Sequence, residues 1–246
     1  MAAANKITQW LCLALIGASA LQQTAVAEAR CATDLLARFA DQELSYQAEW
    51  KGLSLDSIRR IRQLDDGRWE AYNRSSLMFM SIEERSRFAL EDGQIRSLDY
   101  LYDRQGMSDK RDLRLEFAPG YYQVSSPRGD GRLEAPLPIY DLLNHQLQMR
   151  IDLACSPRRE HYRYPIARRN RISDYDYRLV GEESVTTAAG TFDALVLERG
   201  EPGDKLDRIW LAPKLDYLIV RLLHQEDDGS AELQLLRNPA LSSGSD

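Results

Sequence analysis

Histidine, cysteine and lysine are scarce in this chain of 246 residues, which contains three histidines, three cysteines and five lysines. The histidines, His145, His161 and His224, lie far apart and form no HxH or HExxH pattern. No cysteine has a CxxC partner, so the ligand spacings of common zinc sites are missing. These absences predict a protein with no metal ion and no other cofactor.

The common catalytic motifs are missing as well. The chain has neither a GxSxG nucleophile turn nor a GxxxxGK[ST] phosphate loop. Adjacent acidic pairs such as Glu182–Glu183 do not predict a catalytic dyad, because neighbouring strand residues point to opposite faces of a sheet. We therefore expect no catalytic residues and no enzyme activity. A hydrolase whose two carboxylates come from distant parts of the chain is the enzymatic alternative.

Long apolar runs are confined to the N-terminal region, where Trp10 to Leu21 is preceded by Lys6 and followed by the small-x-small pattern Ala25-Val26-Ala27. This order predicts a signal peptide over residues 1–27, cleaved between Ala27 and Glu28. An N-terminal helix that stays attached is the alternative. No later run is long enough to span a bilayer. We expect an exported, soluble protein of the periplasm, with no transmembrane anchor in the mature chain.

Positive charge is in the minority. Without residues 1–27 the chain keeps 31 basic and 38 acidic residues, a net charge of about −7. A general nucleic-acid binder needs a basic surface, so no nucleic-acid partner is expected. Arg158 to Arg171 is a local basic run that could bind phosphate groups of anionic lipids, but we favour a solvated hairpin loop there.

Two cysteines, Cys31 and Cys155, remain after the predicted cleavage. Disulfides form and persist in oxidising compartments such as the periplasm. We therefore predict a disulfide between Cys31 and Cys155, with two buried free thiols as the alternative.

Alternating apolar and polar residues dominate the rest of the chain. In ELSYQAEW, Leu44, Tyr46, Ala48 and Trp50 share one face, as in a half-buried strand. Asp-Gly pairs at 66–67, 92–93 and 228–229 lie between alternating segments and predict hairpin turns. Further strands are expected at residues 69–75, 81–90, 95–103, 111–117, 161–167, 172–185, 191–199, 205–211, 218–225 and 231–237.

One segment has helical spacing. Leu143, Leu147, Ile151 and Ala154 recur about four residues apart, which predicts an amphipathic helix over Tyr140 to Ala154 with its polar residues away from the sheet. The expected fold is mainly β: a curved antiparallel sheet or partly open β-barrel of about a dozen strands, with this helix packed on it. It forms a single domain over residues 28–238, followed by a disordered tail over residues 239–246.

Aromatic and apolar residues recur along the predicted strands and helix. A curved sheet that does not fill its own interior can hold an apolar ligand. Six residues are the candidate lining of such a site: Trp50, Phe79, Tyr100, Leu143, Leu147 and Trp210.

The chain resembles the exported bacterial proteins classified as domain of unknown function 3108 (DUF3108). The resemblance is carried by YQAEWKGLSL (46–55), DDGRW (65–69), YDLL (140–143), YRLVGEESVTTAAGTFDALVLER (177–199) and IWLAPKLDYLIVRL (209–222). It implies an envelope protein with a curved antiparallel sheet like that of periplasmic lipoprotein carriers, and it assigns no site.

Taken together, these features predict a non-enzymatic envelope protein that binds a lipid-like or other apolar ligand, or a protein partner in the envelope. Two alternatives remain at this point. One is a structural or chaperone-like module with a filled core, and the other is the hydrolase described above.

Overall fold

A single antiparallel sheet makes up most of the protein. The computed structural model describes residues 23–50, 52–106, 108–135, 137–201, 205–226 and 229–237. Within these residues 14 strands form one sheet in the order β8-β7-β6-β5-β4-β3-β2-β1-β14-β13-β12-β11-β10-β9. The strands are β1 (Glu43–Trp50), β2 (Leu53–Gln63), β3 (Trp69–Leu77), β4 (Met80–Glu91), β5 (Gln94–Gln105), β6 (Leu113–Ala118), β7 (Tyr121–Ser125), β8 (Gly131–Glu134), β9 (His161–Ala167), β10 (Ile172–Thr187), β11 (Gly190–Gly200), β12 (Leu206–Ala212), β13 (Leu218–Glu226) and β14 (Gly229–Leu235).

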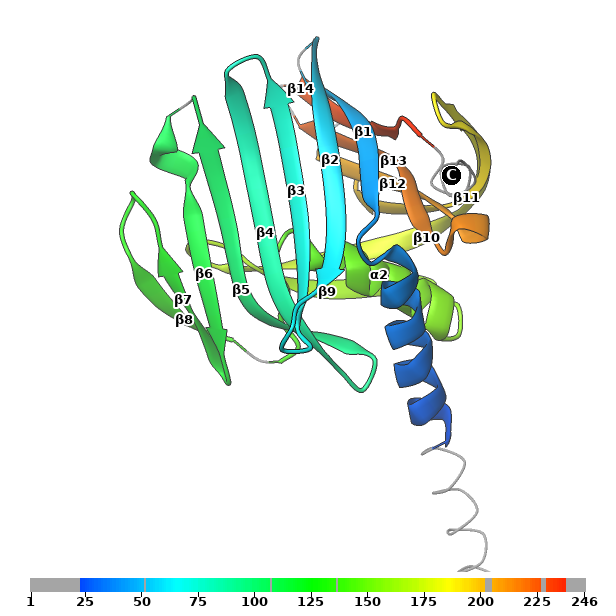
Figure 1. Ribbon diagram of the computed structural model, residues 1–246, viewed down its shortest axis with the longest axis horizontal. Helices are drawn as coiled ribbons and strands as arrows, with labels where there is room; N and C mark the ends of the chain where they lie inside the picture. The colour runs from blue at the N-terminus through cyan, green and yellow to red at the C-terminus, as the bar shows by residue number, and fades with distance from the viewer. Residues whose placement is uncertain are drawn as a thin grey trace, which may run out of the picture.

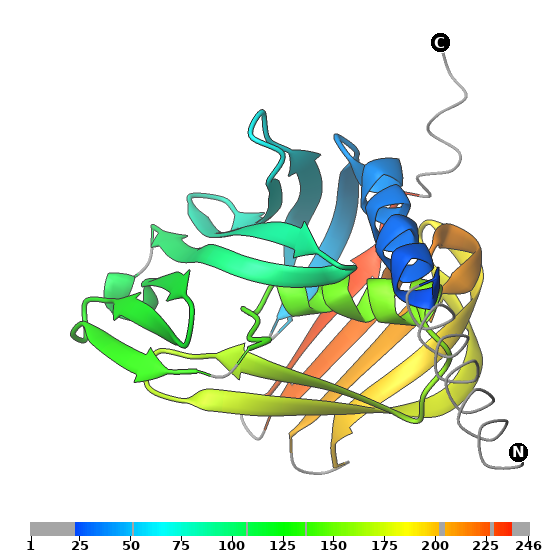
Figure 2. The same ribbon diagram turned by 90° about the horizontal axis from the view of Figure 1, so that it is seen from below.

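The sheet is a meander of hairpins whose first and last strands pair with each other. β1 lies beside β14, with Tyr46 opposite Leu235, so the two halves of the chain join at the middle of the sheet. β8 and β9 are its two ends and do not pair, so the sheet curves without closing (Figures 1 and 2). The predicted curved, open antiparallel sheet is confirmed. The sequence analysis missed β2, β7 and β8.

Helix α2 (Asn144–Cys155) lies inside the curve of the sheet (Figure 2). The expectation of a one-sided amphipathic helix was wrong, because eight of its side chains, polar ones included, are buried. Asn144 Nδ2 donates to Ser97 Oγ at 2.9 Å, and Gln148 Oε1 accepts the backbone N–H of Ile95 at 2.8 Å. The polar side of the helix is thus hydrogen-bonded to the sheet instead of to water, as buried polar groups require.

The helix begins at Asn144, not at Tyr140, because a buried carboxylate caps it. Asp141 Oδ1 accepts the backbone N–H groups of Leu143 and Asn144, both at 2.8 Å. Asp141 Oδ2 accepts the Ser86 hydroxyl at 2.6 Å. One turn later, His145 Nδ1 is 3.1 Å from the Asp141 carbonyl oxygen, and its Nε2 is 3.4 Å from the Tyr177 hydroxyl. The start of α2 is therefore held between strands from both halves of the sheet.

Asp141 and His145 should give opposite dependences of stability on pH. Burial raises the pKa of Asp141 to about 7, and burial lowers the pKa of His145 to about 4. Between these values the folded state keeps a proton on Asp141 that the unfolded state has lost, so the Asp141 contribution falls by about 4 kcal/mol as pH rises from 4 to 7. The folded state lacks a proton on His145 that the unfolded state holds below pH 6.5. The His145 contribution therefore rises by about 3 kcal/mol from pH 4 to 6.5.

Urea unfolding of wild type, Asp141→Asn and His145→Asn between pH 4.5 and 7.5 checks this. Relative to wild type, the unfolding free energy of Asp141→Asn should increase with pH, and that of His145→Asn should decrease with pH. Parallel curves for the three proteins would show that neither group has a shifted pKa.

Another helix, over residues 23–39, precedes β1 and packs beside the end of α2 (Figure 1). We call it the first helix because it comes first among the described residues. Its side chains Leu35, Leu36 and Phe39 are buried in the core. Cys31 and Cys155 form the disulfide, with Cα atoms 5.6 Å apart. The first helix is thus covalently tied to the last turn of α2.

Some expectations concern residues that the structure does not describe. Residues 1–22 of the predicted signal peptide and the predicted tail 239–246 lie outside the described residues. Among the described helices, none has both the length and the apolar character needed to cross a membrane.

Candidate functional site

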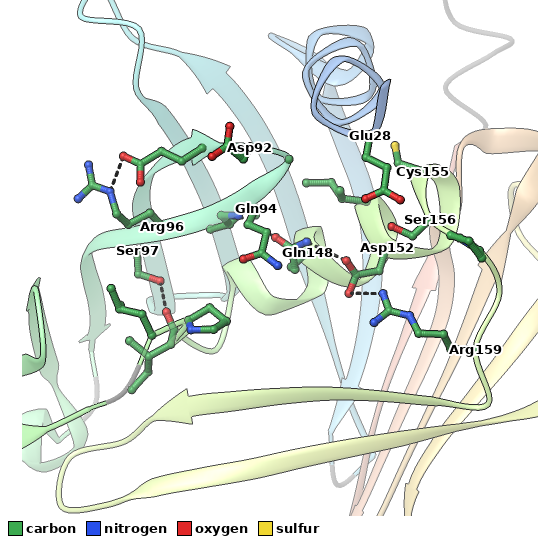
Figure 3. Close-up of a pocket in the computed structure, with 18 residues that line it drawn as sticks. Glu28, Asp92, Gln94, Arg96, Ser97, Gln148, Asp152, Cys155, Ser156 and Arg159 are labelled. Atoms are coloured by element: carbon green, nitrogen blue, oxygen red, sulfur yellow. Dashed lines mark hydrogen bonds and ion pairs between the residues drawn. The ribbon is translucent and has the colours of Figure 1, made fainter. Parts of the chain in front are cut away.

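A groove of about 710 Å³ lies beside the C-terminal half of α2. Its walls are the β4–β5 turn with the first half of β5, the segment 137–139, the loop 156–159 and Glu28 of the first helix. We call it the α2–β5 groove. Figure 3 shows that Gln148 and Asp152 of α2 point into it, with Glu28 and Arg159 at its margins. Polar groups alternate with the apolar side chains of Leu137, Ile139 and Ile151, so the groove differs from a lipid cavity.

The first half of β5 has an open edge at this groove. β5 pairs with β4 from Gln94 onward, but with β6 only from Asp99 to Tyr102. Residues 94–97 therefore have a strand on one side only. On the other side the Gln148 side chain accepts the Ile95 N–H at 2.8 Å, where a further strand would place a carbonyl oxygen. An unpaired strand edge is a template for another extended segment.

The segment 137–139 fixes the far wall of the groove. Ser97 Oγ donates to the Ile139 carbonyl at 2.8 Å, which holds this segment close to β5. The Leu137–Pro138 peptide bond is cis. Leu137 is 59% exposed and leaves apolar surface available at the groove.

Asp152 is the principal charged group within the groove. It accepts hydrogen bonds from Gln148 Nε2 and from the Tyr164 hydroxyl, both at 2.9 Å, and lies 3.7 Å from the Arg159 guanidinium. Burial raises the pKa of Asp152, and the hydrogen bonds from Gln148 and Tyr164 oppose that rise. The negative charge of Glu28 adds to the rise. Asp152 is thus a preoriented hydrogen-bond acceptor whose partners hold it in place.

The groove is lined by several groups that can donate or accept hydrogen bonds. Among the residues that the structure describes, no three His, Cys, Asp or Glu side chains are grouped so as to hold a metal ion. The polar groups of the groove are amides, carboxylates, hydroxyls and guanidiniums, which can pair with the N–H and C=O groups of a polypeptide backbone.

The six residues predicted to line an apolar site lie in different surroundings, and their role in ligand binding stays a prediction. Tyr100, Leu143, Leu147 and Trp210 are buried, whereas Trp50 and Phe79 are 48% and 77% exposed at hairpin ends. None of the six lines the α2–β5 groove. Leu143 and Leu147 adjoin a cavity of only about 40 Å³. The physical reason is that α2 occupies the interior of the curved sheet, so the apolar side chains pack against one another.

The residues that line the α2–β5 groove were not predicted as site residues. Gln148 and Asp152 stand four residues apart on α2, which places them on one helix face, but their polarity assigned that face to solvent. The four-residue spacing shows that Gln148 and Asp152 share a helix face. The sequence does not show that this face borders β5.

A family model described as "Protein of unknown function (DUF3108)" matches residues 45–236. The chain belongs to the DUF3108 family. The suspected resemblance is confirmed over most of the chain, and the match includes β5, α2 and the loop 156–159 of the groove. Glu28 and Cys31 precede the matched segment, so the disulfide joins a residue outside the DUF3108 match to one inside it.

Solved structures with similar chain courses share little sequence with this DUF3108 protein. A β-barrel-like protein of family DUF1849 from Brucella abortus is 7% identical with a TM-score of 0.49, covering 79% of this chain and 94% of that one. MucB is 14% identical with a TM-score of 0.35, covering 86% of this chain and 58% of that one. The complex of MucA and MucB from Pseudomonas aeruginosa gives 16% identity, a TM-score of 0.29, and coverage of 84% and 56%. The DUF3108 chain thus spans little more than half of MucB. No curated protein matches the chain.

Proposed function

We propose that this DUF3108 protein is a non-enzymatic binding protein of the cell envelope whose α2–β5 groove holds an extended segment of a partner protein. The observation that carries the proposal is the open edge of β5 at residues 94–97, which lines the α2–β5 groove. An incoming strand would displace the Gln148 side chain from the Ile95 N–H and take over that backbone donor. Binding by strand addition draws affinity from main-chain hydrogen bonds and specificity from neighbouring side-chain pockets.

Export to the periplasm is part of the same proposal. The apolar run Trp10–Leu21 and the Ala25-Val26-Ala27 pattern support it. Residues 23–27 of the first helix are exposed, and its first buried side chain is Ala32. Cleavage before Glu28 would therefore remove no buried side chain among the described residues 23–27. A disulfide is also typical of an exported protein.

The alternative function is a structural or chaperone-like module with a filled core. Because α2 fills the interior of the curved sheet, this alternative is favoured over a carrier of an apolar ligand. The α2 helix takes the place that a lipid-like ligand would need. Binding of an apolar ligand is one possible result of the peptide selection described next. The proposal includes no enzyme activity.

Selection of random peptides on the purified, disulfide-intact chain tests strand addition. We expect selected peptides to slow hydrogen exchange of backbone amides in residues 94–97. Leu137→Arg, which alters the apolar wall of the groove, should weaken peptide binding at least tenfold. Met78→Arg is the matched control, because Met78 is an 88% exposed apolar side chain outside the groove.

Three outcomes would contradict the proposal. Selection could yield no binding peptide, which favours the filled structural module. Met78→Arg could weaken binding as much as Leu137→Arg does, which places the site elsewhere. Binding of an apolar dye or an extractable lipid in place of peptides would restore the carrier reading.

A further inference from the structure

A second cavity, of about 430 Å³, lies at the start of α2 and shares no lining residue with the α2–β5 groove. Its walls are the start of α2, the turn between β9 and β10, and the inner faces of β10 to β13. We call it the α2–β10 cleft. It includes Arg168 and Arg171, which belong to the basic run singled out in the sequence and have no part in the proposed peptide groove.

Positive charge predominates in the α2–β10 cleft. Arg168, Arg171, Arg199 and Lys205 line it, against the two carboxylates of Asp174 and Asp207. This excess of cations stands on a chain with a net charge of −6. The Asp207 carboxylate already has two partners, because it forms an ion pair with Arg199 and a hydrogen bond with His224 Nδ1.

Arg168 and Arg171 keep their charge available for a ligand. The Arg168 guanidinium donates to the Tyr175 hydroxyl at 2.9 Å, and Arg171 Nε donates to the Ser173 hydroxyl at 3.2 Å. Both acceptors are neutral. No carboxylate of the described residues forms an ion pair with either arginine.

The β9–β10 turn, which carries these arginines, is hydrogen-bonded to β7 at the other end of the open sheet. The Tyr122 hydroxyl of β7 lies 2.8 Å from the Arg168 carbonyl oxygen and 3.0 Å from that of Arg171. The Arg168 N–H donates to the Arg171 carbonyl at 2.9 Å. The two guanidiniums therefore project from a braced turn, which reduces the conformational freedom they would lose on binding.

Aromatic rings form the adjoining wall. Tyr175 and Tyr177 lie 6.2 Å apart between ring centroids, and His145 packs edge-on to Tyr175 at 5.6 Å. The Arg199 guanidinium lies 3.7 Å from the Tyr175 ring centroid. Leu142 and Ile209 complete an apolar part of the wall.

From this arrangement we infer that the α2–β10 cleft binds an organic anion. A phosphate or carboxylate group lies against Arg168 and Arg171, and its apolar or aromatic body lies against Tyr175. Guanidinium groups pair with such oxyanions through two parallel hydrogen bonds, which makes arginine the suited residue. The same chemistry is offered by a free small molecule and by an anionic lipid headgroup.

Calorimetric titration of the purified chain with phenyl phosphate, benzoate, inorganic phosphate and phosphatidylglycerol vesicles tests the inference. We expect phenyl phosphate or benzoate to bind more tightly than inorganic phosphate, and more weakly as salt is raised. Binding of vesicles alone would identify a lipid headgroup as the source of the anion. The double variant Arg168→Gln/Arg171→Gln should weaken binding at least tenfold. Arg171→Gln alone, an exposed change that leaves the Arg168–Tyr175 bond intact, should weaken it severalfold.

Arg158→Gln/Arg163→Gln is the matched control, because it removes the same charge from exposed arginines of the same run outside the cleft. This control should bind like wild type. Equal loss in both double variants would reduce the effect to net charge and overturn the inference. Absence of binding to all four probes would overturn it as well. Leu137→Arg should leave anion binding unchanged, so failure of the peptide proposal and of this one can be told apart.

Discussion

Met149→Asp is expected to leave the protein unfolded at room temperature. The Met149 side chain is 0% exposed and belongs to α2, which lies inside the curved sheet. An aspartate there would place an ionised carboxylate in the core, where an unpaired charge is strongly unfavourable. The expected loss is at least about 5 kcal/mol, comparable with the whole stability of an ordinary domain.

Circular dichroism and thermal melting check this expectation. Met149→Leu keeps the volume and apolar character, so it should cost less than about 1.5 kcal/mol and serves as the control. A folded Met149→Asp protein that melts within a few degrees of wild type would show that α2 opens readily. In that case α2 would behave as a lid, and the apolar carrier would become the better reading.

Removal of the disulfide is expected to have the second-largest effect. Cys31 and Cys155 are separated by 124 residues in the sequence, so their bond closes a long loop. In the chain-entropy model a loop of this length stabilises the folded state by about 4–5 kcal/mol. Cys31→Ser/Cys155→Ser should therefore lower the melting temperature by about 10–15 °C, and the first helix should exchange its amide hydrogens faster.

The measurement combines melting curves with thiol counting. Wild type recovered from the cell envelope should show no free thiol after denaturation, and its mass should correspond to a chain that begins at Glu28. Reduction of wild type should reproduce the melting temperature of the double variant. Two free thiols in the exported chain, or an intact N-terminus at Met1, would contradict the disulfide and the processing site respectively.

Hairpins were predictable because their signals are local. The Asp66–Gly67 and Asp92–Gly93 pairs mark observed turns, and both glycines have φ of +80°. That left-handed conformation is one that glycine adopts without steric cost. β2 was missed because its sequence, LSLDSIRRIRQ, carries three arginines and lacks a clean alternation. β7 and β8 have five and four residues, which is too short for a periodic pattern to stand out.

The sequence by itself determined the β-rich character, most of the hairpins, the helical periodicity of α2 and the membership in the DUF3108 family. Each of these depends on neighbours a few residues apart or on a stretch of matching residues. Only the tertiary structure decided what surrounds α2. Asn144 and Gln148 look like solvent-facing residues until Ser97 and the backbone of Ile95 are brought against them from about 50 residues away.

The candidate sites were decided in the same way. The α2–β5 groove joins residues from Glu28 to Arg159, and the α2–β10 cleft joins residues from Leu142 to His224. A cavity is the space left between elements that pack together, so it depends on how the sheet curves and on where the helix lies within it. Neither of these is encoded in a local pattern of residues, which is why the strands were largely predictable from the sequence and the linings of the two cavities were not.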